Sequence, residues 1–192
     1  ATPVASGMLG MYLHVTNRLY FLAALFSLAA LAKGTVVINE IHHDPDVKTE
    51  LAEFIELHNT GTEPVDLSGW VIGDAVTFTF PEGTRMDGGA FVVVAHNPAQ
   101  FKAKFGGSPL GPWLGKLDND GERIELRDAT GQLVDRVRYR LGFPWPIVGD
   151  PPGYSIELIH PELDNNNGDN SKPSVRGDAS TKVNRTEERR GG

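Results

Sequence analysis

Two short groups of polar side chains have the residue types and the spacing to bind a metal ion. In the first group, His42 and Asp44 stand beside His43 and Asp46, and imidazole and carboxylate ligands of this kind suit Zn²⁺. Successive side chains near the end of a strand face opposite ways, which would separate His42 from His43. The sequence therefore favours a polar loop at a strand end over a metal site here.

The second group is the oxygen-rich turn that contains Asp118, Asp120 and Glu122. It is similar to part of a Ca²⁺-binding loop, but it lacks the full alternating set of ligands that ends in a bidentate Glu. A tight turn built on Asn, Asp and Gly at residues 118–121 explains the same residues. We therefore expect no bound cofactor, and Ca²⁺ is the alternative.

Possible catalytic residues are scarce in this sequence. Two of Glu53, Glu56, Glu122 and Glu125 could pair as the carboxylates of a glycosidase. These residues alternate with apolar ones in strand-like segments, so we expect them to be charges that face solvent. The chain has no Cys, and none of its Ser residues lies in a Gly-x-Ser-x-Gly elbow. The sequence thus predicts a protein that is not an enzyme.

The elements that would position these residues are mostly short strands. Segments rich in β-branched and aromatic residues are separated by clusters of Gly, Pro, Asn and Asp. One helix is expected at residues 97–106, with Asn97 as N-cap, Pro98 in the first position and Gly106 at the stop. Half-buried strands need a facing sheet, so we predict an all-β sandwich with one short helix. The expected strands are residues 35–41, 52–58, 70–74, 76–80, 91–95, 122–127, 133–139 and 154–159.

The expected core centres on Trp70, a large ring that follows Ser68 and Gly69 at the start of a strand. Residues 91–95 are a short apolar run, which predicts a strand buried on both faces. The other residues expected in the core are Phe54, Ile55, Leu57, Val93, Ile124, Leu126, Ile156 and Leu158.

The chain divides into three parts by composition. Residues 1–32 are predicted to be a secretory signal peptide with upstream residues, because the apolar run 19–32 ends in Ala30-Leu31-Ala32. That run has 14 residues, whereas a membrane-spanning helix needs about 20. The folded domain is expected at residues 33–163, followed by a disordered polar tail or linker at residues 164–192. We therefore expect a secreted or cell-envelope protein.

Charge and cysteine content narrow the range of partners. Without Cys, the chain has no disulfides and no thiolate metal site, so its stability must come from the core. Residues 33–170 hold 11 Lys and Arg against 22 Asp and Glu, a net charge of −11, and residues 171–192 carry +3. An acidic body disfavours nucleic acid. We expect an extracellular or envelope partner, protein or polysaccharide, and contact with a membrane only through the signal peptide during export.

Several ordered blocks follow one another at regular spacing over about residues 35–163: Val37-Ile-Asn-Glu-Ile41, Glu53-Phe-Ile-Glu-Leu57 with Asn59, Val65-Asp-Leu-Ser-Gly-Trp70, Phe78-Thr-Phe-Pro81, Gly121-Glu-Arg-Ile-Glu-Leu126, Val134-Asp135 and Tyr154-Ser-Ile-Glu-Leu158. Together they resemble the lamin tail domain as it occurs in secreted bacterial proteins. The resemblance implies an immunoglobulin-like β-sandwich without an enzymatic site of its own. It also implies a non-catalytic exported module for binding, attachment or targeting. The alternative is an accessory domain of a larger exported hydrolase or nuclease whose catalytic part lies outside this chain.

Overall fold

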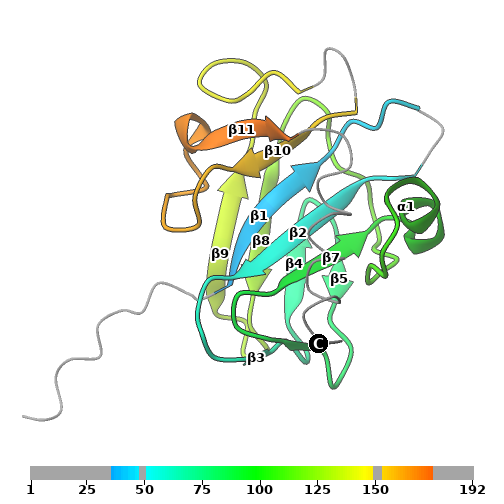
Figure 1. Ribbon diagram of the computed structural model, residues 1–192, viewed down its shortest axis with the longest axis vertical. Helices are drawn as coiled ribbons and strands as arrows, with labels where there is room; N and C mark the ends of the chain where they lie inside the picture. Colours follow the sequence, from blue (N-terminus) through cyan, green and yellow to red (C-terminus); the bar gives the residue numbers. More distant parts are fainter. Residues whose placement is uncertain (1–35, 48–50, 149–152, 175–192) are drawn as a thin grey trace, which may run out of the picture. The chain divides into compact units, whose positions relative to one another are not determined.

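The structure, a computed structural model, describes residues 36–47, 51–148 and 153–174. These residues form two antiparallel sheets, a two-stranded ribbon and one short α-helix (Figure 1). The predicted signal peptide and its cleavage site lie outside the described residues. Within the described part of the chain, no helix is both long enough and apolar enough to cross a membrane. The expectation of an all-β fold with one short helix is confirmed.

The first sheet has five strands in the order β11-β10-β1-β2-β7. β1 and β2 are its centre, and their register places Val37 opposite His58. A β-bulge between Ile38 and Glu40 interrupts this pairing. The strands of this sheet are β1 (Val36–His42), β2 (Phe54–Asn59), β7 (Phe91–Ala95), β10 (Ser155–Leu158) and β11 (Ser171–Ser174).

The second sheet has four strands in the order β5-β4-β8-β9. β8 and β9 are consecutive in the chain and pair antiparallel, with Ile124 opposite Val137. A separate ribbon joins β3 and β6. The strands are β3 (Val65–Asp66), β4 (Val71–Asp74), β5 (Phe78–Thr79), β6 (Arg85–Met86), β8 (Arg123–Arg127) and β9 (Leu133–Arg138).

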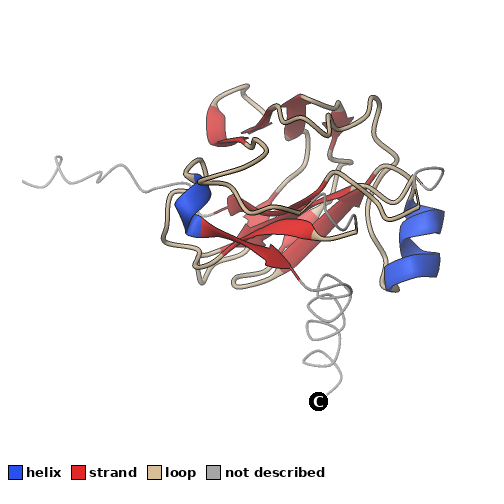
Figure 2. Ribbon diagram, turned by 90° about the horizontal axis from the view of Figure 1, so that it is seen from above, coloured by secondary structure: helices blue, strands red, loops and turns tan. Residues whose placement is uncertain are grey.

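The main core lies between the two sheets, because one buried cluster contains residues of both, such as Ile55 of β2 and Ile124 of β8. A second, smaller cluster lies under the helix α1 (Pro98–Phe105) and is centred on Phe101. The side chain of Asn97 caps α1 as predicted. The eight residues expected in the core besides Trp70 are all buried, and Figure 2 shows α1 beside the sheets.

Trp70 is not the core anchor that we predicted. It lies just before β4 and is only half-buried, packed against the main cluster. Leu67 is fully buried instead, and its carbonyl accepts a hydrogen bond from the Trp70 N–H (2.9 Å). Gly69 turns the chain between them with a φ of 71°. This left-handed turn directs Leu67 inward and leaves the Trp70 ring at the margin of the core.

The expected boundary at residue 163 is also wrong. Residues 164–174 form a loop, a 3₁₀ turn η1 (Gly168–Asn170) and strand β11, which pairs with β10. The loop folds because Asn165 binds strands of both sheets: its amide donates to the carbonyl of Ile38 (2.9 Å) and to Asp135 Oδ2 (2.6 Å). A bulge frees backbone groups on β1, and a buried backbone group requires a partner. The rest of the predicted tail, residues 175–192, lies outside the described residues.

The described residues all fall within one compact unit of the chain. Both hydrophobic clusters and all the strand pairings of the described residues belong to this unit. The described residues therefore build a core of their own, which is the property of an independently folding domain.

Candidate functional site

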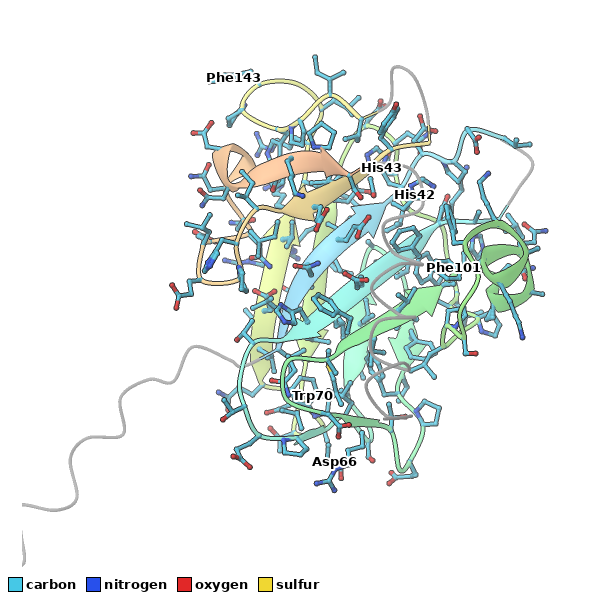
Figure 3. The ribbon with its side chains drawn as sticks, viewed as in Figure 1. His42, His43, Asp66, Trp70, Phe101 and Phe143 are labelled. Carbon is cyan, nitrogen blue, oxygen red and sulfur yellow. The ribbon has the colours of Figure 1, made fainter. Side chains whose placement is uncertain are left out.

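Polar side chains from separate segments gather where β1 ends and β2 begins. The loop after β1, the residue before β2, the residue after β7 and residues 113–122 all meet there. Figure 3 shows His42 and His43 at this end, with Asp66 and Trp70 at the other. We call the gathered residues the end cluster: Asp44, Glu53, His96, Asn119, Glu122 and Tyr139.

Glu53 is the most strongly perturbed acid of the end cluster. Its side chain is 2% exposed, and its Oε2 accepts a hydrogen bond from the N–H of Leu117 (3.0 Å). Burial raises the pKa of Glu53 to about 7, partly opposed by the Leu117 hydrogen bond and by Lys116. This carboxyl therefore keeps its proton to a much higher pH than an exposed glutamate does.

His96 lies beside Glu53, with its Nδ1 3.6 Å from Glu53 Oε2. That distance is longer than a hydrogen bond. The imidazole also stacks on the indole of Trp113, with ring centroids 5.8 Å apart. Burial, and then the charge of Lys116, lower the pKa of His96. The imidazole is consequently neutral at pH 7, so this contact is not an ion pair.

Tyr139 contacts the turn at residues 118–122. Its hydroxyl donates to the carbonyl of Asp118 (2.7 Å) and lies 3.2 Å from Glu122 Oε1. Burial, and then the charge of Glu122, raise the pKa of Tyr139 above its ordinary value. The phenol is thus a permanent hydrogen-bond donor, and its ring stacks on the imidazole of His43 (5.0 Å).

The structure joins the two groups in which we considered a metal. The amide of Asn119 donates to Asp44 Oδ1 (2.9 Å), which connects the loop after β1 to the turn at residues 118–122. In that turn the Asp118 carboxylate accepts the N–H of Asp120 (2.8 Å), and the Glu122 carboxylate accepts the N–H of Asp118 (2.6 Å). These acids hold the backbone of the turn. Among the described residues, no group of three or more His, Cys, Asp or Glu side chains could hold a metal ion.

His42 is separated from His43, as its strand position predicts. Its ring stacks on Phe54 (5.1 Å between centroids) and meets the edge of Phe105, so it belongs to the side of the sheet that α1 covers. Burial, and then the charge of His43, lower the pKa of His42 to about 4. Its imidazole is therefore a neutral packing group at physiological pH.

The prediction that the strand glutamates face solvent is wrong for Glu53, Glu56 and Glu125, which are all buried. Glu56 accepts a hydrogen bond from the amide of Asn39 (2.8 Å), and Glu125 forms an ion pair with Arg127 (2.6 Å). Alternation in a strand sets the direction of a side chain, but it does not set what covers that side. Each buried carboxylate is accordingly matched to a donor.

The end cluster borders an open depression of about 730 Å³. Glu122 and Tyr139 belong to its lining, together with Asp120, Arg138 and Arg140. The six residues of the end cluster include no Ser, Thr or Cys, so none of them is an alcohol or thiol nucleophile. The side chains of the end cluster can accept hydrogen bonds from backbone groups, and the protonation of Glu53 changes with pH. The end cluster is thus a set of hydrogen bonds that connects loops.

Sequence reasoning missed Glu53, His96 and Tyr139 as one group. Their positions are far apart in the chain. The pairing of β2 with β7 places Glu53 beside His96, and the pairing of β8 with β9 in the other sheet places Tyr139 beside Glu122. One local signal was available: each stands at the end of an expected strand, where polar side chains of adjacent strands meet.

Comparison with known proteins identifies the family. The model of the family described as Lamin Tail Domain matches residues 29–140. Lamin-C of Drosophila melanogaster is 38% identical over 85 residues, an alignment that covers 38% of this chain. The chain spans 13% of the length of that relative. Lamin tail domains have an immunoglobulin-like fold, which agrees with the two sheets described above.

Proposed function

Because the chain belongs to the lamin tail domain family, we propose that it is a non-catalytic, exported module that binds or attaches to a component of the cell envelope or its surroundings. The observation that carries this proposal is the use of the acids in the end cluster. Glu53, Glu122 and Asp44 accept hydrogen bonds from Leu117, Asp118 and Asn119, respectively. They connect loops, and we infer that the domain is a scaffold.

Export is supported by the apolar run at residues 19–32 and its Ala30-Leu31-Ala32 end. The complete absence of Cys is compatible with an oxidising compartment, because no thiol can mispair there. The net charge of −11 over residues 33–170 supports a protein or polysaccharide partner over a nucleic acid.

The experiment has two parts. The full chain is expressed in a secreting bacterial host, and the exported protein is analysed by mass spectrometry. We expect a new N-terminus at Lys33, and a variant with Ala30 and Ala32 replaced by Arg should remain unprocessed. An intact leader on the exported protein would contradict the proposal.

In the second part, a fluorescent fusion of residues 34–192 is incubated with envelope preparations of the organism that encodes it. Retention should exceed that of the fluorescent protein alone. Prior digestion of the envelopes with protease or with polysaccharide hydrolases separates the two partner classes. Equal retention of the fusion and the fluorescent protein alone would refute attachment.

A second candidate function is that of an accessory part of a larger exported hydrolase or nuclease. The matched segment of Lamin-C supports it, since there a domain of this family occupies a small part of a longer polypeptide. The genomic DNA beyond the codon for Gly192 tests this alternative. Several hundred further codons with a catalytic motif would favour it, and an immediate stop codon would reject it.

A further inference from the structure

One loop of the described chain carries large apolar side chains in water although its base is fixed in the core. Trp145 is buried, and its backbone N–H donates to the carbonyl of Gly142 (2.9 Å). Gly168 packs so closely on this turn that a Cβ there would lie 2.7 Å from the Trp145 nitrogen. Pro144 and Pro146 restrict the backbone further. The tip of the loop is therefore held outside the core.

The side chains at the tip are exposed to an unusual degree. Phe143 is 96% exposed, Ile147 is 71% exposed and Leu141 is 50% exposed. We call residues 141–147 the apolar loop. Figure 3 shows Phe143 at the outer limit of the molecule, far from Phe101 and Trp70. Large apolar side chains gathered on one exposed segment mark a surface for a partner or a membrane.

Three arginines lead into the apolar loop. Arg136, Arg138 and Arg140 alternate along β9 and its continuation, and all three are exposed. None of them forms an ion pair with a residue that the structure describes, whereas Arg127 of the neighbouring strand pairs with Glu125 (2.6 Å). As far as the described residues go, these charges can bind an external anion.

Arg138, Arg140 and Phe143 share a depression of about 450 Å³ on the flank of the loop. Asn166 and Asn167 complete its wall, and no acidic residue lines it. The rest of the domain is acidic, so this depression stands out as a local site for negative charge.

We propose that the apolar loop docks onto a lipid membrane surface that carries anionic headgroups. Phe143 and Ile147 enter the boundary between headgroups and acyl chains, and Arg138 and Arg140 bind the phosphates above it. The shape of the site favours this occupant, because a protruding tip with cations beneath it matches an interface that is apolar inside and anionic outside. Single-stranded nucleic acid would instead need several aromatic platforms along a continuous basic groove.

This inference goes beyond the proposed function, whose partner is a protein or a polysaccharide. It adds a direct contact between the folded domain and lipid that does not depend on the signal peptide. Protein-free vesicles test it without any envelope partner, so the two proposals can fail separately.

The experiment measures cosedimentation of residues 34–192 with vesicles of phosphatidylcholine alone and of phosphatidylcholine with an equal part of phosphatidylglycerol. We expect binding to the anionic vesicles that weakens at high salt. Phe143→Ser should lower the partition coefficient about tenfold or more, because the aromatic side chain that enters the membrane is lost. Arg138→Gln and Arg140→Gln should each lower it about fivefold, which corresponds to about 1 kcal/mol per charge.

The matched controls remove the same chemistry from other places. Leu114 is 75% exposed on a different loop, and Arg85 is exposed on β6. Leu114→Ser and Arg85→Gln should bind as the wild type does, and circular dichroism confirms that every variant is folded. The proposal is overturned if the wild type does not bind anionic vesicles, or if the loop variants and the controls lose binding equally. If vesicle binding is absent, two further results would identify another occupant of the apolar loop. Self-association that Phe143→Ser abolishes would indicate a second copy of the chain, and binding to a soluble polyuronate would indicate an acidic polysaccharide.

Discussion

The buried carboxyl of Glu53 makes the stability of this domain depend on pH in a direction that can be predicted. Glu53→Gln replaces the carboxyl with a neutral amide of the same shape. The amide oxygen can still accept the hydrogen bond from the Leu117 N–H, which is 3.0 Å long in the wild type. The substitution therefore removes the titration and keeps the contact.

The sign follows from the raised pKa. In the folded protein the pKa of Glu53 is about 7, against an ordinary value of 4.5. As the pH rises from 4.5 to 7, the unfolded chain releases this proton before the folded protein does. The free energy of unfolding of the wild type therefore decreases over this window, and the decrease is complete above the folded pKa. A difference of about 2.5 pKa units corresponds to about 3 kcal/mol.

The assay is urea denaturation of both proteins at about pH 5 and about pH 8. We expect Glu53→Gln to have nearly the stability of the wild type at the lower pH and to exceed it by about 1–3 kcal/mol at the higher pH. His42, with a pKa of about 4, and His96, with a lowered pKa, reduce stability as the pH falls below their unfolded value of 6.5. They do so in both proteins, so the difference isolates Glu53. Identical pH dependence in the two proteins would refute a protonated Glu53.

Three further predictions concern packing and hydrogen bonding, and each is tested by chemical denaturation. Leu67→Ala should cost about 2–5 kcal/mol and more than Trp70→Ala, because Leu67 is fully buried while Trp70 is half-buried; the reverse order would restore Trp70 as the core anchor. Gly168→Ala should cost about 1–3 kcal/mol, since its Cβ would meet the Trp145 backbone; an unchanged midpoint would show that this turn is not tightly packed. Tyr139→Phe should cost about 1–2 kcal/mol, because the carbonyl of Asp118 loses its donor; no change would mean that water replaces the hydroxyl.

Much of the fold could be predicted because its signals are local. The helix at α1 follows from Asn97, Pro98 and Gly106, whose capping roles depend only on neighbouring residues. The strands follow from runs of β-branched residues between turn formers. Trp70 was misplaced because the size of a ring does not indicate where a turn will point it, and the left-handed Gly69 settled that direction.

The end cluster could be predicted only in pieces. His42, Asp44 and the 118–122 turn were visible as polar groups, but Asn119 joins them across 75 residues of sequence. The burial of Glu53 depends on Leu117 and the loop that carries it, 64 residues away. Contacts between residues so far apart in the sequence follow from the register of the sheets, which one sequence taken by itself does not specify.

Hydrogen bonds of buried and half-buried polar side chains explain how a sandwich without disulfides keeps its two sheets together. At one end, Glu53 binds the loop that follows α1, and Asp44 binds the turn before β8. Near the bulge of β1, Asp135 of β9 accepts the N–H of Ile38 (2.6 Å), so a carboxylate of one sheet completes the hydrogen bonding of the other. Asn165 donates to the same carboxylate oxygen. Each of these links serves backbone or amide groups that burial would otherwise leave without a partner. These acids hold the two sheets together, so substitutions there would destabilise the fold. The exposed loops, above all residues 141–147, are therefore the part of the domain where substitutions can alter what the domain binds without unfolding the domain.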